Sequence, residues 1–198
     1  NFFKNNTLYL SKSSIVKTKS NVVFGNNIIF EGSNIIGHKT KILSNCKIIN
    51  SNIGEENIIR DSTIVENCII KSGNLIGPFC FIRDSKINKK NIIGTFVEMA
   101  RSICENNNKI SHRAYIGDTR IFSNVIIGAG VTTCNYKNNK RYKCTIKSNV
   151  LVGSGTQLIA KVVIGENSTI AAGSIVNKNI KVNTKLIQKR STLLNTIR

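Results

Sequence analysis

The chain has 198 residues, which is enough for one sizeable domain with its own core. Its apolar share is 40%, aromatic residues supply only 6%, and the formal net charge is +19. It contains neither a secretory signal nor a stretch of about 18 apolar residues, so we expect a cytoplasmic protein without membrane insertion.

Residue 1 is Asn and not Met, so residues 1–7 are interpreted as the end of a linker from a missing N-terminal domain. Through most of residues 8–176 an isoleucine, valine or leucine recurs every six residues. The runs are Leu10, Val16, Val22, Ile28; Ile36, Ile42, Ile48; Ile58, Ile64, Ile70, Ile76, Ile82; and Ile146, Val152, Leu158, Ile164, Ile170, Val176. A period of six fits neither a helix nor an ordinary strand and is typical of the hexapeptide parallel β-helix. We therefore predict an all-β domain over 8–176, a three-sided prism of roughly nine coils.

The repeat stops between Ile127 and Ile146, where polar, basic and aromatic residues predict an inserted loop over 133–145. A loop that leaves a rigid solenoid commonly carries binding groups, so we expect this one to belong to a functional site. After residue 176 the repeat is lost, and residues 177–198 are predicted to leave the prism as a short C-terminal arm.

The chain has six cysteines and two histidines. The cysteines show no CxxC spacing, so we expect free thiols packed as small apolar groups. His38 follows a corner glycine and is expected at an exposed turn. His112 stands shortly before the loop, and stacking of coils at about 4.8 Å predicts that Arg83, Glu98 and Tyr115 lie near it. These neighbours make His112 the stronger functional candidate of the two histidines.

Several segments together resemble one enzyme family in order and spacing. They are Ile76-Gly77-Pro78-Phe79 followed by Arg83, Phe96-Val97-Glu98-Met99, His112-Arg113-Ala114-Tyr115-Ile116-Gly117-Asp118, Ile127-Gly128-Ala129-Gly130, Thr133-Cys134-Asn135-Tyr136, Val152-Gly153-Ser154-Gly155-Thr156-Gln157-Leu158 and Ile170-Ala171-Ala172-Gly173. They resemble the C-terminal half of the bacterial bifunctional enzymes that make UDP-N-acetylglucosamine, a glucosamine-1-phosphate N-acetyltransferase. The hexapeptide repeat occurs in many acyltransferases and in some non-enzymes, so the Thr-Cys-Asn-Tyr and His-x-x-Tyr segments are the specific part.

The resemblance implies a left-handed coil, a homotrimer with active sites between adjacent prisms, and acetyl transfer from acetyl-CoA to glucosamine 1-phosphate. In that reaction His112 would be the general base, Glu98 would orient the histidine or the amine, and Asn135 would bind the oxyanion. The product would serve UDP-N-acetylglucosamine synthesis for peptidoglycan and lipopolysaccharide. No metal is implied in this domain; magnesium is expected only in the missing N-terminal uridylyltransferase domain.

The same resemblance implies two sets of ligand contacts. Those to the sugar phosphate are Arg83, Tyr115 and Arg141. Those to acetyl-CoA are Ala129, Asn135, Tyr136, Ser154, Ala172 and, in the tail, Lys189 or Arg190.

Two positions depart from the family pattern. Ala100 stands where the family has a phosphate-binding lysine, and Ile126 stands where it has a sugar-contacting asparagine. Arg101 follows Ala100, but adjacent strand residues point to opposite faces, so it is an uncertain substitute. Each loss is expected to cost roughly 1–3 kcal/mol of acceptor binding, with the acetyl-CoA side intact.

Other functions compete with this hypothesis. An acyltransferase with an altered acceptor and a degenerate trimerisation scaffold both fit Ala100 and Ile126. A metal-dependent hydratase needs about three histidine ligands, whereas His38 and His112 lie some four coils apart. A nucleic-acid scaffold would fit the charge, but the basic residues are spread through the repeats, as in a genome rich in A and T. We therefore expect no nucleic-acid partner.

Overall fold

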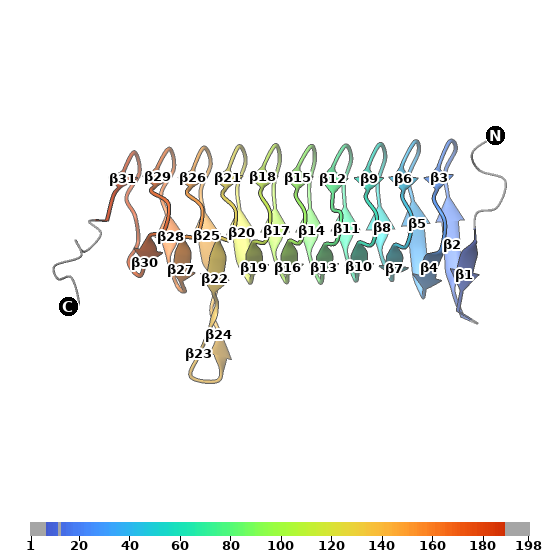
Figure 1. The fold of residues 1–198 in the computed structure, drawn as a ribbon, viewed down its shortest axis with the longest axis horizontal. Helices are drawn as coiled ribbons and strands as arrows, with labels where there is room; N and C mark the ends of the chain where they lie inside the picture. Colours follow the sequence, from blue (N-terminus) through green and yellow to red (C-terminus); the bar gives the residue numbers. More distant parts are fainter. Residues whose placement is uncertain (1–6, 12, 189–198) are drawn as a thin grey trace, which may run out of the picture.

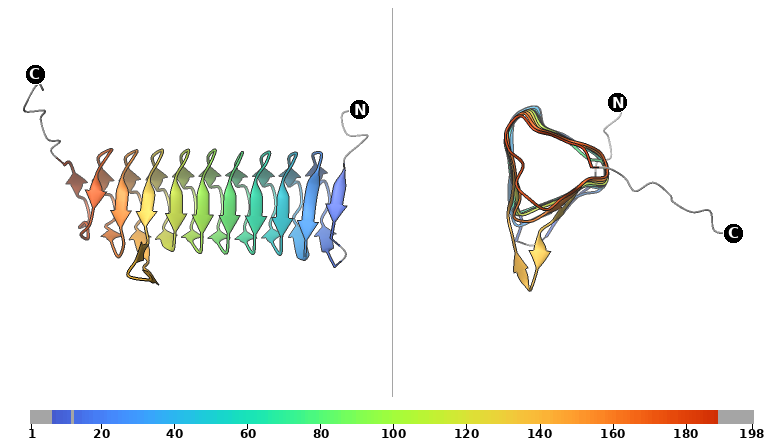
Figure 2. Two further views of the ribbon diagram at one scale, coloured as in Figure 1. Left: turned by 60° about the horizontal axis from the view of Figure 1, so that its bottom comes forward. Right: turned by 90° about the vertical axis from the view of Figure 1, so that its left-hand side faces the viewer.

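The computed structural model describes residues 7–11 and 13–188, and every regular element within them is a β-strand. Most of these strands belong to three long parallel sheets, which form the three sides of a straight prism (Figure 1). Viewed along its axis the prism is a triangle, and a hairpin projects from one corner (Figure 2). The predicted all-β, left-handed parallel β-helix is confirmed.

Sheet A contains, in order along the prism, β1 (Leu8–Leu10), β4 (Ile28–Glu31), β7 (Lys47–Ile49), β10 (Ile64–Glu66), β13 (Phe81–Arg83), β16 (Glu98–Ala100), β19 (Tyr115–Gly117), β22 (Thr132–Cys134), β27 (Gln157–Ile159) and β30 (Ile175–Val176). Sheet B contains β2 (Ile15–Thr18), β5 (Ser33–Ile36), β8 (Asn52–Ile53), β11 (Ile69–Ile70), β14 (Lys86–Ile87), β17 (Ile103–Cys104), β20 (Thr119–Ile121), β25 (Cys144–Ile146) and β28 (Val163–Ile164). Sheet C contains β3 (Val23–Phe24), β6 (Lys41–Ile42), β9 (Ile58–Ile59), β12 (Leu75–Ile76), β15 (Ile92–Ile93), β18 (Lys109–Ile110), β21 (Ile126–Ile127), β26 (Leu151–Val152), β29 (Thr169–Ile170) and β31 (Lys185–Leu186). The hairpin consists of β23 (Tyr136–Lys137) and β24 (Lys140–Arg141).

Each coil turns three corners, which we name by the sheets that they join. In one central coil the A–B corner contains Asp118, the B–C corner contains residues 122–125, and the C–A corner contains residues 111–114. The coils stack in register at about 4.8 Å, so the same corner position recurs on neighbouring coils. Side chains at one corner therefore form rows parallel to the prism axis.

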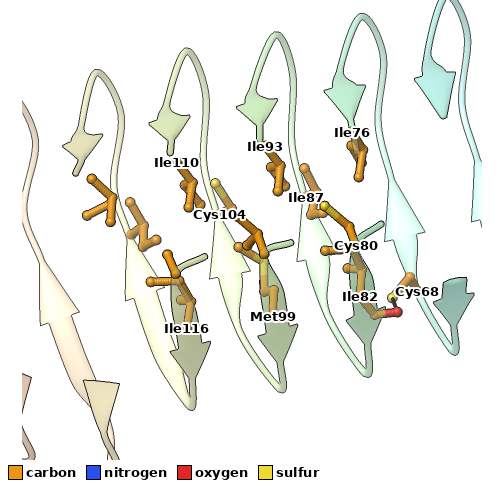
Figure 3. Close-up of a cluster of buried hydrophobic side chains, with 14 of the residues drawn as sticks. Cys68, Ile76, Cys80, Ile82, Ile87, Ile93, Met99, Cys104, Ile110 and Ile116 are labelled. Atoms are coloured by element: carbon orange, nitrogen blue, oxygen red, sulfur yellow. Dashed lines mark hydrogen bonds between the residues drawn. The ribbon is translucent and has the colours of Figure 1, made fainter. Parts of the chain in front are cut away.

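The interior of the prism is a stack of inward-pointing aliphatic side chains. Ile76, Ile93 and Ile110 follow one another in sheet C and are fully buried (Figure 3). Branched side chains are favoured in the buried strands of parallel sheets. Cys104 lies in the same interior, and all six cysteines are free. The expectation of packed free thiols is confirmed for five of them, whereas Cys134 is half-buried.

The central coils repeat every 17 residues, one fewer than three six-residue faces predict. The A–B corner of these coils is one residue shorter than the pattern predicts, which makes Ile53 an inward position. The prediction that Ile58 and Ile64 point inward is therefore wrong, and their neighbours Ile59 and Val65 are the fully buried residues. The shorter period also accommodates more coils than predicted, since sheets A and C have ten strands each.

The insertion is shorter than the predicted 133–145. Thr133 belongs to β22 and Cys144 to β25, so the chain leaves the prism only over residues 135–143. Thr133 is fully buried and occupies the next inward position, where its hydroxyl accepts the Gly117 N–H over 2.7 Å. The six-residue pattern missed this position because it counts only aliphatic residues, while a threonine whose hydroxyl is hydrogen-bonded is tolerated inside.

The C-terminal arm is predicted over 177–198, but the prism continues beyond residue 176. Ile180 forms a bridge with Ile164, and β31 pairs with β29, so the coil continues to the end of the described residues. The last coil is only 16 residues long, which removes the six-residue spacing although the prism persists. Residues 189–198, like most of the expected linker over 1–7, lie outside the described residues.

Candidate functional site

The outer face of sheet A carries three predicted site residues on neighbouring coils. Arg83 ends β13, Glu98 begins β16, and Tyr115 begins β19, where it pairs directly with Glu98. The Arg83 guanidinium donates to the Glu98 carboxylate over 2.9 Å. Its Nε–H is buried and has no acceptor within the described part of the chain, so one donor of the guanidinium fork is unsatisfied.

A second group of predicted residues forms a row along the C–A corner. His112, Ala129, Ser154 and Ala172 occupy the same corner position on successive coils. The backbone carbonyls of His112, Ala129 and Ser154 each accept an N–H from a glycine on the next coil, over 2.8 to 2.9 Å. These glycines are, in the same order, Gly130, Gly155 and Gly173. The side chains beyond His112 are small and those glycines have none. The corner is therefore a narrow, unobstructed ridge.

His112 stands exposed at one end of this row. Its Nδ1 accepts the backbone N–H of Thr95, on the preceding coil, over 3.2 Å. A neutral imidazole that accepts at Nδ1 carries its own proton on Nε2. No hydrogen bond joins His112 to Glu98 among the described residues: Glu98 binds Arg83, and His112 binds Thr95. In the single chain Glu98 therefore makes no contact through which it could orient His112. That Glu98 orients the acceptor amine stays a prediction.

The third group lies on the inserted hairpin, at the opposite edge of sheet A. Tyr136 and Arg141 pair across the hairpin and are exposed. Asn135, at its base, is only 5% exposed, and its side-chain amide donates to the Asp118 carboxylate. The Asn135 carbonyl accepts the N–H of Tyr142 over 2.8 Å, which closes the hairpin above it.

Asp118 and Arg101 complete this A–B corner, although Asp118 has no predicted role. The Arg101 Nε–H and Nη2–H donate to the two Asp118 oxygens over 2.9 and 3.0 Å. Burial would raise the pKa of the Asp118 carboxyl, but the hydrogen bonds from Arg101 and Asn135 outweigh it and hold this pKa below its ordinary value. Hydrogen bonding to Asp118, and more weakly to Tyr115, raises the pKa of the Arg101 guanidinium. A common spacing of 17 residues links Arg101, Asp118 and Asn135, and this spacing is the signal that could have revealed them.

The two departures from the family pattern are visible in the structure. Ala100 is fully buried and pairs with Arg83 in sheet A, so no cation occupies its position. Arg101 turns away from this face at the corner to bind Asp118. Ile126 lies on the outer face of sheet C, 46% exposed, and offers no polar side-chain atom.

The single chain thus divides the predicted residues between two edges of one sheet. Between the C–A row and the hairpin lies the width of sheet A, whose three-residue strands span about 10 Å. Lys189 and Arg190, the predicted tail contacts, lie outside the described residues. Over residues 7–11 and 13–188 no three His, Cys, Asp or Glu side chains gather to hold a metal, and no helix is long and apolar enough to cross a membrane.

Comparison with known proteins finds one family match within the chain and several solved structures of similar fold. Residues 143–178 match the family model of the bacterial transferase hexapeptide, described as six repeats. The UDP-N-acetylglucosamine acyltransferase of Francisella novicida is similar over 87% of this chain and 62% of its own, with 18% identity and a TM-score of 0.59. The Arabidopsis UDP-N-acetylglucosamine acyltransferase matches 87% of this chain and 67% of its own, with 15% identity and a TM-score of 0.46. At these identities the likeness is one of fold, and the chain spans under two thirds of the Francisella protein.

Proposed function

We propose that this chain transfers the acetyl group of acetyl-CoA to the amine of glucosamine 1-phosphate. The observation that carries the proposal is the row of small residues along the C–A corner, which ends at an exposed histidine beside the Arg83–Glu98–Tyr115 face. The resemblance of the whole residue set to the bifunctional acetyltransferase family supports it. The hexapeptide transferase match over residues 143–178 supports transferase chemistry in general.

Acetyl-CoA would lie along the C–A corner. From His112 to Ala172 the row crosses three coil steps of about 4.8 Å each, about 14 Å, which suits an extended, narrow pantetheine chain. Ser154 offers a hydroxyl to the amide groups of such a chain, while Ala129 and Ala172 leave room for it. The thioester would then lie at the His112 end of the row.

The acceptor would bind on sheet A. The unsatisfied Nε–H of Arg83 and the rest of its guanidinium fork suit a phosphate oxygen. Tyr115 and Glu98 lie on the next coils along the sheet and would contact the sugar and its amine. Ala100 leaves this face without one cation, and Ile126, on sheet C, lacks the hydrogen-bonding group that the resemblance implies for the sugar, so acceptor binding is expected to be weaker than coenzyme binding.

The reaction joins the amine nitrogen to the acetyl carbonyl carbon and breaks the carbon–sulfur bond. His112 would take the proton from the nitrogen, and the departing CoA thiolate would receive a proton to leave as free thiol. With Nδ1 bound to the Thr95 N–H, the resting imidazole has its proton on Nε2. It must therefore change tautomer and release Thr95 before Nε2 can act as the base. Asn135 would donate to the oxyanion of the tetrahedral intermediate.

The active site would be shared between copies of the chain in a homotrimer. One chain places the His112 row and the Asn135 hairpin on opposite edges of sheet A, so a neighbouring copy must supply the missing half of each site. Exposed Ile92, Ile126 and Leu151 give sheet C an apolar surface on which such a copy could pack. We further propose a cytoplasmic parent protein that also carries the uridylyltransferase domain and makes UDP-N-acetylglucosamine for peptidoglycan and lipopolysaccharide.

Release of free CoA thiol tests the proposal. Purified protein supplied with acetyl-CoA and glucosamine 1-phosphate should release thiol, and His112→Ala should lower the rate about a hundred- to ten-thousandfold. His38→Ala is the matched control. His38 also occupies a corner, but it lies several coils away from His112 and binds Ser20. An inactive wild type, or His112→Ala with unchanged turnover, would contradict acetyl transfer by this site.

A different acceptor is the second candidate, and buried Ala100 together with Arg101 turned toward Asp118 favours it. Both remove positive charge from the face that would hold the phosphate. The same thiol assay with other amino sugars, lacking the phosphate or carrying it elsewhere, separates the two. A higher kcat/KM for one of these than for glucosamine 1-phosphate would replace the leading proposal.

A further inference from the structure

Asp118 binds both ends of the inserted hairpin. At its start, the Asp118 carboxylate accepts the side-chain amide of Asn135. At its end, the Asp118 carbonyl accepts the N–H of Cys144 over 3.2 Å. Gly117, next to Asp118, donates its N–H to the Thr133 hydroxyl below the hairpin. The segment that leaves the prism is thus attached at both ends to one residue of the preceding coil.

The orientation of the Asn135 amide follows from these contacts. A carboxylate only accepts hydrogen bonds, so the amide must present its NH2 group and not its oxygen to Asp118. A Cβ built on Gly117 would lie 2.5 Å from Asn135 Nδ2 and 2.6 Å from the Tyr115 hydroxyl, so both polar groups converge over this glycine. Asn135 is thereby held next to Tyr115 on the edge of the sheet A face.

Arg101 holds Asp118 in turn. The side chains of Arg101 and Asp118 are only 24% and 12% exposed, and the two bonds between them use both carboxylate oxygens. A bidentate guanidinium–carboxylate pair fixes the plane of the carboxylate as well as its place. The direction of the oxygen that meets Asn135 is therefore set by Arg101.

We propose that Asp118 is a positioning residue for acetyl transfer: it aims the Asn135 amide and fixes the hairpin, and Arg101 orients it. The inference rests on the proposed function, because it is the role of Asn135 at the oxyanion that makes its aim matter. It also assigns Arg101 to this row and not to the phosphate. The loss of the lysine at Ala100 is then uncompensated.

Asp118→Asn tests this role. Arg101 and Asn135 together donate three hydrogen bonds to the two carboxylate oxygens. If either oxygen becomes an NH2 group, it faces a donor and at least one of these hydrogen bonds is lost. We expect kcat to fall at least about tenfold through misplacement of Asn135, while the KM for acetyl-CoA changes less than about threefold. Trypsin should cut the hairpin, after Lys137, Lys140, Arg141 or Lys143, at least about tenfold faster than in the wild type.

Two variants complete the test. Glu105→Gln is the matched control, because it removes the carboxylate charge from the Glu105–Arg120 pair (2.7 Å) of neighbouring sheet B without touching the hairpin. Arg101→Lys keeps the charge but loses the fork, and should fall between the wild type and Asp118→Asn in both readouts. If the Asp118→Asn protein does not fold, the same two measurements on Arg101→Lys test the positioning role instead.

The outcomes separate the positioning role from the proposed function. Asp118→Asn that matches Glu105→Gln in cleavage and in kcat would overturn the positioning role. Faster cleavage with unchanged kcat, or lower kcat with unchanged cleavage, would overturn it as well. A wild type that is inactive with acetyl-CoA and glucosamine 1-phosphate contradicts the proposed function; hairpin cleavage in Asp118→Asn then still decides whether Asp118 holds Asn135 and the hairpin.

Discussion

The interior and the outer face of the same strands follow different rules. Inside, Ile76, Ile93 and Ile110 repeat one residue type at one position, and each is fully buried. Outside on sheet A, Glu98 and Tyr115 occupy equivalent positions on adjacent strands and share no chemistry. The interior of each coil needs only an apolar side chain of suitable size, whereas the outward residues at equivalent positions differ from coil to coil.

The difference shows where stability and function reside in a solenoid. Each coil is covered only by its neighbours, so an interior defect weakens nearby coils and is not spread over a large core. An outer-face change leaves that packing intact and alters one contact, such as the 2.9 Å bond between Arg83 and Glu98. Stability and activity should therefore respond to different substitutions, even at adjacent residues.

The neighbouring isoleucines of β11 give the largest expected effect. Ile70 is 1% exposed and Ile69 is 41% exposed, so Ile70→Ala removes interior packing while Ile69→Ala removes only surface area. We expect Ile70→Ala to lower the free energy of unfolding by about 2–5 kcal/mol and Ile69→Ala by less than about 1 kcal/mol. Chemical denaturation of both variants measures this. Equal losses would show that the two faces do not differ.

The sequence predicts the interior well because its signal is repeated many times. The six-residue spacing, as in Ile146, Val152 and Leu158, recurs so often that one position with a different residue does not hide it. It failed where geometry changed without a change in composition, at the shorter A–B corner that exchanges Ile58 for Ile59. Turn length is set by backbone conformation, and apolar spacing reports it only indirectly.

The site is predicted less completely, for a physical reason. His112 and Asn135 are recognisable by their motifs, but the partner that holds each one comes from the preceding coil. Thr95 contributes a backbone N–H, for which residue type gives no signal. Asp118 was visible in the His-x-x-Tyr segment, yet its role depends on a register of 17 residues that the six-residue pattern did not contain.

The thiols give a second, smaller contrast between interior and surface. Burial raises the pKa of the thiols of Cys46, Cys68, Cys80 and Cys144 from 9.0 to about 11, and that of Cys104 to about 12. Burial also raises the pKa of Cys134, but this residue is only half-buried. At about pH 8 a thiol whose pKa is raised from 9.0 to about 11 has about a hundredfold less thiolate than an unshifted thiol, and a buried sulfur is also closed to reagents. The half-buried Cys134 should therefore react first with a thiol reagent.

Mass spectrometry after timed alkylation identifies which cysteine has reacted, and Cys134→Ser should abolish the fast phase. Above pH 9.0 the unfolded chain loses its thiol protons while the buried thiols keep theirs up to about pH 11. The free energy of unfolding should therefore fall as pH rises through this window. A buried thiol that reacts as fast as Cys134 in the folded protein would contradict the closed interior.

Ala100→Lys is the smallest and most local test, since it adds one charge to the outer face beside Arg83. A lysine stem can cover apolar surface while its ammonium reaches outward, so the long side chain need not enter the interior. If the acceptor phosphate binds this face, the added cation should lower the KM for glucosamine 1-phosphate about tenfold and leave the KM for acetyl-CoA unchanged. Ala100→Met has a similar stem without the charge and should not improve binding. A KM equally unaffected in both variants would mean that the acceptor phosphate does not bind beside Arg83, and would favour the acceptor without a phosphate there.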